Sequence, residues 1–187
     1  MAKGGSFDFR EVRKLQKQIE AIEKGKDAFC RECARELAAR LLQKIVKRTP
    51  TGEKPDYLTK APKIVKAKGS GGKSSAFLSR EGAILQKYWS GYVGGTLKRS
   101  WTVGDIQKTG DGYQVEIFNP TEYASYVEYG HRQEPGRYVP ALGRRLKKGW
   151  VPGKLMMTIS EKEIEKATPK LLEKKLEEYL RRCLDGE

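Results

Sequence analysis

The chain has 187 residues, 37% of them hydrophobic and 33% charged, which suits one domain with a modest core and a large solvated surface. Its formal net charge of +14 points to polyanions, meaning nucleic acid or acidic protein surfaces, as partners. The sequence contains no apolar run of about 18 residues and no apolar leader of the secretory type, so we expect no membrane partner. Three cysteines, an odd number, argue against a disulfide framework and indicate a reducing intracellular compartment.

The positive charge is concentrated in two stretches. Residues 1–50 hold 13 Lys and Arg against 7 Asp and Glu, and residues 51–100 hold 10 against 3. These two ranges together form the first basic stretch, residues 1–100. The second basic stretch lies between residues 135 and 160 and contains no Asp or Glu; its cations are Arg137, Arg144, Arg145, Lys147, Lys148 and Lys154. Such runs are often solvated faces, but aromatic residues interleaved with the lysines of 52–95 favour contact with nucleic acid.

A long amphipathic helix is predicted near the N-terminus, over residues 9–48. Apolar residues recur every four positions from Phe29 to Ile45. We expect Gly25 to divide the stretch into a short and a long helix, with Asp27 as a start signal. Pro50 ends the pattern because proline disfavours helical geometry in the residue before it.

Residues 52–95 differ in composition, since Gly, Ser, Pro and Lys dominate them. The sequence predicts a flexible basic insertion, with a loop over residues 68–75. The apolar residues of 77–89 fit either a helix or a strand.

A small antiparallel hairpin is predicted next, from strands at residues 97–103 and 113–118 around a turn at 109–112. A short helix over 121–129 should end at Gly130, and residues 131–152 should form a long irregular loop.

The last predicted element is a helix that begins at a capping box formed by Ser160 and Glu163. Pro169 should kink this helix or start a second one. The prediction is therefore an α+β fold in a single domain, residues 1–187. In it, a small antiparallel β-sheet packs against long N-terminal and C-terminal helices and carries a long basic insertion at 52–95.

Three patterns suggest chemistry, and each fits a simpler interpretation better. Residues 67–74 match a loose phosphate-binding loop but lack a buried strand before them and a metal-binding Asp after them. Cys30 and Cys33 form a C-x-x-C pair inside a helix, whereas a redox motif normally follows a strand and opens a helix. A zinc site would need two more ligands, and the remaining candidates, Cys183 and His131, are far apart in sequence. His131, the one histidine, has no nucleophile beside it in sequence and is expected to hydrogen-bond locally at the helix exit. We therefore expect no enzyme, no cofactor and no metal.

Five motifs follow one another along the chain in a fixed order. They are Thr49-Pro50-x-Gly, Gly95-Thr-Leu-Lys-Arg-Ser-Trp101, Val115-Glu-Ile-Phe-Asn119, Glu122-Tyr-Ala-Ser-Tyr-Val-Glu-Tyr-Gly-His131 and Trp150-Val-Pro-Gly-Lys-Leu-Met156. This order resembles the tail-completion, or head–tail joining, family of minor tail proteins of long-tailed bacteriophages and prophages. The chain departs from the family in one respect, because more than forty residues separate Thr-Pro from Ser-Trp.

The resemblance implies a structural virion protein that is assembled in the bacterial host cytoplasm and sits in the tail at the head–tail interface. It implies a homo-oligomeric ring, a hexamer, around the DNA channel. The implied neighbours are the tail terminator or tail tube on one side and head-completion or connector proteins on the other.

Two residue sets follow from this interpretation. The candidates for the assembly interface are Tyr123, Tyr126, Glu128, Tyr129, Gly130, His131 and Trp150, because tyrosines combine apolar area with a polar tip and Gly130 allows a left-handed exit. The candidates for transient, non-specific contact with DNA are Lys63, Lys66, Lys68, Lys73, Arg137, Arg144, Arg145, Lys147 and Lys148.

Two other functions stay open at this point. One is a basic nucleic-acid-binding accessory protein that uses the first half of the chain. The other is a small nuclease or nucleotide hydrolase that uses His131 or Lys73. Steep salt dependence of DNA binding would indicate the first, and turnover lost in His131→Ala or Lys73→Ala would indicate the second.

Overall fold

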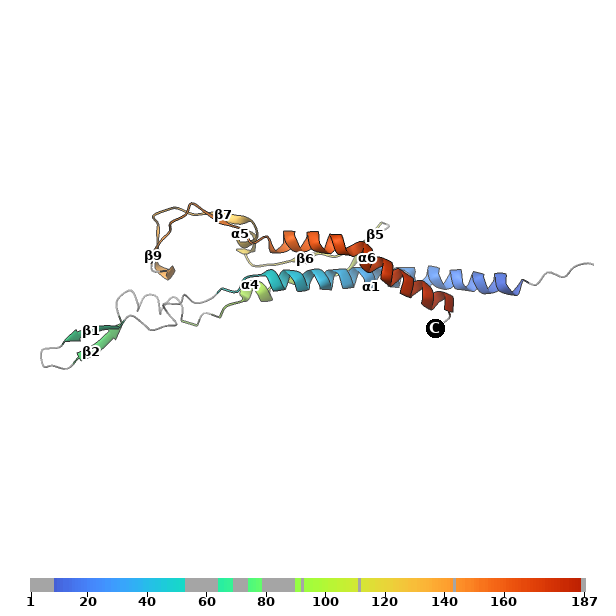
Figure 1. Ribbon diagram of the computed structural model, residues 1–187, viewed down its shortest axis with the longest axis horizontal. Helices are drawn as coiled ribbons and strands as arrows, with labels where there is room; N and C mark the ends of the chain where they lie inside the picture. The colour runs from blue at the N-terminus through green and yellow to red at the C-terminus, as the bar shows by residue number, and fades with distance from the viewer. Residues whose placement is uncertain are drawn as a thin grey trace, which may run out of the picture. The chain divides into compact units, whose positions relative to one another are not determined.

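The computed structural model describes residues 9–52, 64–68, 74–78, 90–91, 93–110, 112–142 and 144–185; for 64–68, 74–78, 141 and 144 it describes the backbone alone. The fold is α+β, as predicted, with two long helices and short antiparallel strand pairs (Figure 1). The chain divides into two compact units. Unit 1 combines residues 1–45, 102–118 and 158–187, and unit 2 combines residues 46–101 and 119–157.

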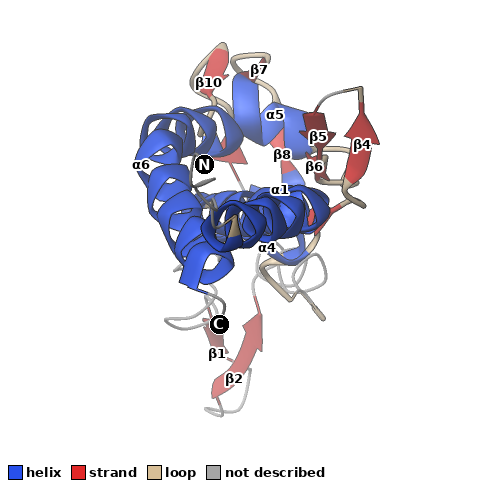
Figure 2. Cartoon of the chain, turned by 90° about the vertical axis from the view of Figure 1, so that its right-hand side faces the viewer, coloured by secondary structure: helices blue, strands red, loops and turns tan. Residues whose placement is uncertain are grey.

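Unit 1 is built on two antiparallel helices, α1 (Arg10–Arg48) and α6 (Met156–Asp185), which run beside each other in Figures 1 and 2. Lys44 pairs with Glu163 at 2.7 Å near one end of the contact, and Gln18 donates to the Leu184 carbonyl at 2.6 Å near the other. Between them, the rings of Phe29 and Tyr179 stack with centroids 4.5 Å apart. These contacts fix the register of the two helices.

Lys175 holds the middle of this helix pair together. Its ammonium lies 2.7 Å from a carboxylate oxygen of Glu32 and 2.7 Å from one of Glu36. The hydrogen bonds from Lys175 lower the pKa of both glutamates, and these hydrogen bonds in turn raise the pKa of Lys175. The predicted apolar stripe faces inward here, with Cys33, Ala38 and Ile45 buried.

The prediction that Gly25 interrupts the first helix is wrong, because α1 is continuous through it. A Cβ at Gly25 would lie 2.5 Å from the Tyr179 hydroxyl oxygen. That hydroxyl donates to the Ile22 carbonyl at 2.7 Å. Glycine at position 25 therefore leaves room for Tyr179 of α6. A glycine inside a helix costs about 1 kcal/mol relative to alanine, which is too little to interrupt α1.

The predicted start of the last helix is also wrong. α6 begins at Met156, so Ser160 lies inside it and is fully buried, while Glu163 pairs with Lys44 instead of capping. Pro169 sits within α6 and starts no second helix, although Figure 1 shows α6 changing direction along its length. The Thr168 hydroxyl donates to the Ile164 carbonyl at 2.8 Å just before this proline.

Two short antiparallel pairs complete unit 1 and confirm the predicted hairpin. β3 (Thr102–Val103) pairs with β6 (Ile117–Phe118), and β4 (Gln107–Thr109) pairs with β5 (Gly112–Gln114). The hairpin is tied to α1 by Lys108, whose ammonium lies 2.9 Å from Asp27. The first predicted strand was too long, because residues 96–99 form a helical turn.

Unit 2 contains the short helices α4 (Thr96–Arg99) and α5 (Ala124–Tyr129). α5 and its end at Gly130 confirm the predicted helix, although it is shorter than expected. The stretch 131–152 is not irregular as predicted. β7 (Gly130–Arg132) pairs with β10 (Trp150–Pro152), and β8 (Tyr138–Val139) pairs with β9 (Arg144–Arg145) after the 3-10 turn η1 (Pro140–Leu142).

Part of the predicted insertion also has regular structure. β1 (Ile64–Lys68) and β2 (Ser74–Leu78) form an antiparallel hairpin in which Ile64 faces Leu78 and Lys68 faces Ser74. The loop predicted over 68–75 therefore includes strand residues at both ends, and residues 69–73 lie outside the described part. None of the described helices is long and apolar enough to cross a membrane.

Candidate functional site

The two halves of the split Thr-Pro and Ser-Trp motif meet in unit 2. The Trp101 indole nitrogen donates to the Thr49 hydroxyl oxygen at 2.8 Å, and Thr49 is 3% exposed. The ends of the insertion between them also come together, since a Cβ at Gly94 would overlap the Gly52 carbonyl oxygen. Gly52, before the insertion, and Gly94, after it, therefore lie at adjacent backbone positions. For this reason the long separation between Thr-Pro and Ser-Trp in the sequence does not prevent the contact between Thr49 and Trp101.

Asn119 connects this contact to the segment that follows. Its side-chain amide donates to the Leu97 carbonyl at 2.8 Å, next to the Ser-Trp motif. Its side-chain oxygen accepts from the Thr121 backbone N–H at 3.1 Å and from the Thr121 hydroxyl at 2.7 Å. This side-chain turn directs the chain toward α5, so three motifs that lie far apart in sequence share one hydrogen-bonded network.

The end of α5 is fastened to the start of α6 by Glu128. This side chain is 5% exposed, and its carboxylate accepts the Met157 backbone N–H at 3.0 Å. The first N–H groups of a helix have no partner inside the helix, and a carboxylate there is favoured by the helix dipole. Glu128 thus provides the cap that the sequence pattern assigned to Ser160.

Backbone contacts reinforce this fastening. The N–H groups of Lys154 and Leu155 donate to the carbonyls of Val127 at 2.8 Å and Glu128 at 3.0 Å. Leu155 has φ +49°, a left-handed conformation that costs a leucine about 1–2 kcal/mol. We call the set α5, β7, β10 and the first turn of α6, residues 124–132 and 150–157, the joint.

Two glycines make the joint possible by close backbone approach. Gly130 has φ +87° and ψ 173°, and a Cβ there would lie 2.8 Å from the Gly153 nitrogen and 3.0 Å from the Trp150 ring, besides overlapping the Val151 carbonyl oxygen. A Cβ at Gly153 would overlap the Glu128 carbonyl. The sequence predicts a conformational role for Gly130. It does not single out Gly153, for which the Pro152-Gly153 pair is the signal that could have identified a tight turn.

His131 lies in β7 opposite Val151. Its Nε2 is 3.4 Å from the Gln133 side-chain nitrogen, and its ring meets the Tyr126 ring edge-on, with centroids 5.9 Å apart. Its Nδ1 is buried and has no hydrogen-bond partner among the described residues. A local contact at the helix exit was the prediction, and no described serine, cysteine or carboxylate stands against the ring as a catalytic partner.

The large aromatic side chains of the joint, and Tyr123 directly before it, are exposed. Their exposed fractions are 45% for Tyr123, 59% for Tyr126, 67% for Tyr129 and 51% for Trp150. Tyrosine and tryptophan are the side chains that most often anchor protein–protein interfaces. Glu128 differs from the other interface candidates because it is buried and acts inside the joint, where it positions α5.

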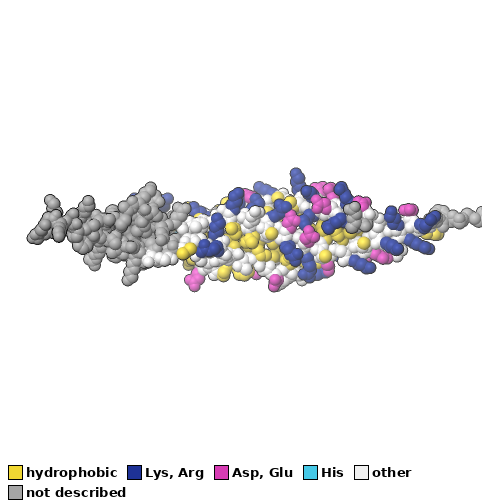
Figure 3. All heavy atoms as spheres, turned by 90° about the horizontal axis from the view of Figure 1, so that it is seen from below, with side chains coloured by type: hydrophobic (Ala, Val, Ile, Leu, Met, Phe, Trp, Pro, Cys, Tyr) yellow, Lys and Arg dark blue, Asp and Glu magenta, His cyan; other side chains and the backbone are white. Residues whose placement is uncertain are grey.

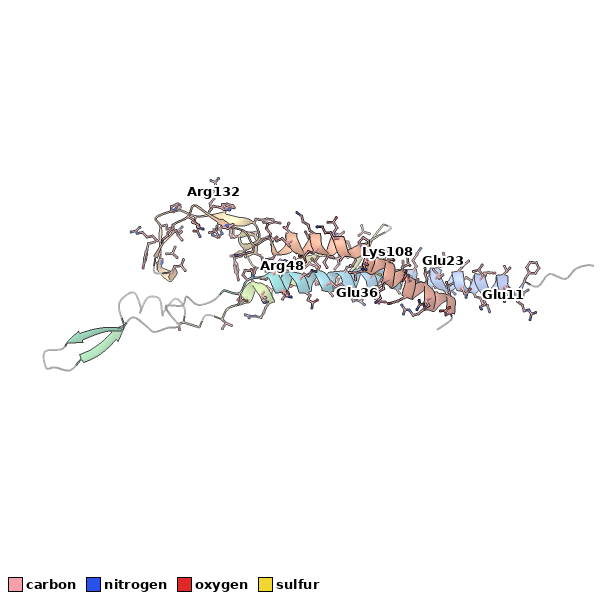
Figure 4. The ribbon with its side chains drawn as sticks, viewed as in Figure 1. Glu11, Glu23, Glu36, Arg48, Lys108 and Arg132 are labelled. Atoms are coloured by element: carbon pink, nitrogen blue, oxygen red, sulfur yellow. The ribbon has the colours of Figure 1, made fainter. Side chains whose placement is uncertain are left out.

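The basic residues of the 131–148 stretch lie on its surface. Arg137, Arg145, Lys147 and Lys148 are exposed, and so is a further cation, Arg132, the last residue of β7, which Figure 4 labels. Arg145 also donates to the Gly136 carbonyl at 2.7 Å, which helps to close the β8–β9 hairpin. Of the remaining DNA-facing candidates, Lys63 and Lys73 lie outside the described residues, and Lys66, Lys68 and Arg144 are described by their backbone alone.

Within the described ranges, no three His, Cys, Asp or Glu side chains are grouped so that they could hold a metal ion. Cys33 faces the core, as predicted, and burial raises the pKa of its thiol, which opposes the reactive thiolate form.

The comparison with protein families identifies the class. The family model HK97-gp10-like, described as "Bacteriophage HK97-gp10, putative tail-component", matches residues 13–130, from α1 through the Tyr-Val-Glu-Tyr-Gly string. A search of curated proteins and a search of solved structures each found no significant match. The chain belongs to this family of bacteriophage tail components, and it is a structural protein of the virion tail.

Proposed function

We propose that this tail component completes the tail and joins it to the capsid connector, as a ring of identical subunits around the DNA channel. In such a ring each subunit contacts its two neighbours through two different, complementary patches, that is, head to tail. These contacts form a closed ring when the rotation from one subunit to the next adds up to a full turn. Its neighbours are the tail terminator or tail tube on one side and head-completion or connector proteins on the other. A hexamer is the ring size that we propose.

The observation that carries the proposal is the set of exposed aromatics on a rigid joint. Four large aromatic side chains are between 45% and 67% exposed, although they stand on elements held by a buried carboxylate and two obligatory glycines. Rigid anchors lose little conformational freedom on docking, which favours assembly over transient contact. We assign Tyr123, Tyr126, Tyr129, His131 and Trp150 to the assembly surface, with Gly130 and Glu128 positioning them.

The exposed cations of residues 132–148 suit a loop beside passing DNA. Contacts of this kind are non-specific and weaken steeply with salt, which allows DNA to move through the channel. The same stretch borders an open pocket of about 650 Å³, whose lining includes Tyr138, Val139, Leu142 and Leu146. We propose that this stretch faces the channel and that its attraction for DNA is weak at physiological salt.

The test is to deplete the protein during phage growth and to examine the lysate by electron microscopy. Loss of a joining protein should leave DNA-filled heads and full-length tails side by side, unjoined. Full-length tails that attach normally would refute the proposal. Missing tails would assign the protein to tail building, and empty heads would favour the nucleic-acid-binding alternative.

A further inference from the structure

The open pocket of unit 2 lies on a single two-stranded ribbon, residues 130–152. β7 pairs with β10 at one end of this ribbon, and β8 pairs with β9 toward the other. Between these pairs the ladder continues, because the Gln133 N–H donates to the Gly149 carbonyl at 2.9 Å and the Leu146 N–H donates to the Arg137 carbonyl at 2.8 Å. Figure 1 shows the ribbon curving between β7 and β9. A hydrogen-bonded backbone therefore shapes the pocket of about 650 Å³, which is preformed, as ligand sites usually are.

The lining of the pocket is largely apolar. Val139, Leu142 and Leu146 are half-buried in it, and Tyr138 is 46% exposed beside them. A phosphate or carboxylate placed among such side chains would lose its hydration without gaining hydrogen bonds, which is costly. The interior of the pocket therefore fits a large apolar side chain and not a charged group.

The charged residues of the ribbon are nearly all cations. Residues 131–149 contain six Lys and Arg and one acid, Glu134, which gives six positive charges minus one, or +5. Arg132, Arg137 and Glu134 belong to the pocket lining, and all three are exposed. Within the described ranges, neither arginine forms an ion pair. An exposed, unpaired guanidinium can bind a carboxylate through two hydrogen bonds at once.

The two long helices carry their charge differently. Figure 3 shows acidic and basic side chains mixed over them. Several of these are paired, as Lys44 is with Glu163 and Lys175 is with Glu32. The ribbon differs because one acid stands among six cations, so its surface attracts groups of negative charge.

We infer that the pocket binds a short acidic segment of a neighbouring virion protein, which places a large apolar side chain in the pocket and its carboxylates on the arginines at the rim. The inference rests on the proposed function only for the source of the segment, since a joining protein contacts other virion proteins. Such a segment supplies both the apolar group and the negative charge that the ribbon lacks.

Duplex DNA matches the charge of the ribbon but not its pocket. The bases of a duplex are stacked inside it, and the phosphates that it presents outside do not suit an apolar lining. Carboxylates bound at the rim would also neutralise part of the charge that faces DNA, in agreement with the weak attraction proposed for this stretch.

Selection from a library of random linear peptides tests the inference, because it does not require the partner to be known. The library is selected on the immobilised full-length protein at physiological salt, and the affinity of the enriched peptides is measured by fluorescence polarisation. We expect these peptides to combine several acidic residues with a large apolar one. A duplex and a single-stranded oligonucleotide are measured alongside them.

Two double substitutions with the same change in charge locate the binding. Arg132→Glu with Arg137→Glu, at the pocket, should weaken binding of the enriched peptides about fivefold or more. Lys147→Glu with Lys148→Glu is the matched control, because both lysines are exposed on the same ribbon but lie outside the pocket lining. At physiological salt this control should weaken binding by less than about twofold, since screening favours direct contacts.

Leu142→Ser tests the apolar part of the site. It removes a half-buried side chain of the lining and should also weaken binding about fivefold or more, with the circular dichroism of the protein unchanged. Enriched peptides without an acidic, apolar pattern, or with an affinity that ignores the arginine pair, would overturn the inference. Tighter binding of either oligonucleotide, lost in the arginine variant, would assign the pocket to nucleic acid instead. Peptides that match a stretch of this chain would make a second copy the occupant.

These outcomes are independent of the depletion experiment. If depletion leaves heads and tails unjoined while the selection fails, the joining function stands and the pocket assignment is wrong. If the selection succeeds while depletion blocks tail building, the pocket assignment stands and the joining function is wrong.

Discussion

The joint makes a sharp prediction for Gly130→Ala. Gly130 adopts φ +87° and ψ 173°, a region that is essentially confined to glycine and costs other residues about 1–3 kcal/mol. The added methyl group would also overlap the Val151 carbonyl and lie 2.8 Å from the Gly153 nitrogen. β7 and β10 must then separate and lose about two backbone hydrogen bonds of about 1 kcal/mol each, so we expect a total cost of about 3–5 kcal/mol to the joint.

Gly136→Ala is the matched control for this substitution. Gly136 also has positive φ, +88°, but a Cβ there has no heavy atom within 4 Å. Its cost should be limited to backbone strain of about 1–2 kcal/mol. The difference between the two variants, about 2–3 kcal/mol, therefore isolates the close approach at the joint and corresponds to about 30- to 150-fold in an equilibrium constant.

Amide hydrogen exchange measures this difference where it arises. In Gly130→Ala, the amides of residues 131–132 and 150–151 should exchange about 30- to 150-fold faster than in Gly136→Ala, while the amides of α1 keep their protection. The bulkier Gly130→Val should disturb loop placement and particle assembly more than the folding of the monomer. Equal exchange in the two alanine variants, or infectious particles in normal yield from Gly130→Val, would refute the role given to the joint.

Three further predictions follow from contacts elsewhere in the molecule. Thr49→Val, which removes the acceptor of the Trp101 indole, should lower the free energy of unfolding by about 1–3 kcal/mol in urea titrations, whereas the exposed Thr109→Val should change it by less than about 0.5 kcal/mol. Lys175→Met should destabilise the α1–α6 pair at neutral pH, because Glu32 and Glu36 lose the ammonium that lowers their pKa values. This loss of stability should shrink as the pH falls below the ordinary glutamate pKa of 4.5, since a lowered carboxylate pKa contributes its full stability only above the ordinary value. A loss that does not change with pH in thermal unfolding would contradict this prediction. Replacing residues 53–93 by a two-residue Gly-Ser link should leave the circular dichroism of the helices and the burial of Trp101 intact, since Gly52 and Gly94 are adjacent; an unfolded product would show that the insertion supports the fold.

The elements that depend on local periodicity were predictable from the sequence. The four-residue repeat of apolar side chains predicted α1, and the alternating stretches on either side of a polar turn predicted an antiparallel hairpin, which the β3–β6 and β4–β5 pairs form. The exit of α5 at Gly130 followed from the glycine itself. In each case the relevant interactions lie within a few residues of one another.

The errors arise where a distant residue decides the local structure. Gly25 continues a helix because Tyr179, far along the chain, needs the space of its missing side chain. Ser160 loses its capping role because Glu128 reaches the N–H groups at the start of α6 from another helix. The pairing of β7 with β10 depends on the close approach of Gly130 to Val151, which no short sequence pattern reveals.

The most direct test of the joining function is a cryo-electron microscopy reconstruction of the neck of the mature virion. We predict a closed ring of this chain around the DNA channel, between the end of the tail tube and the capsid connector, with two different faces of each subunit in contact. Density of this chain at the distal tip of the tail, or its absence from the neck, would show that the proposed joining function is wrong.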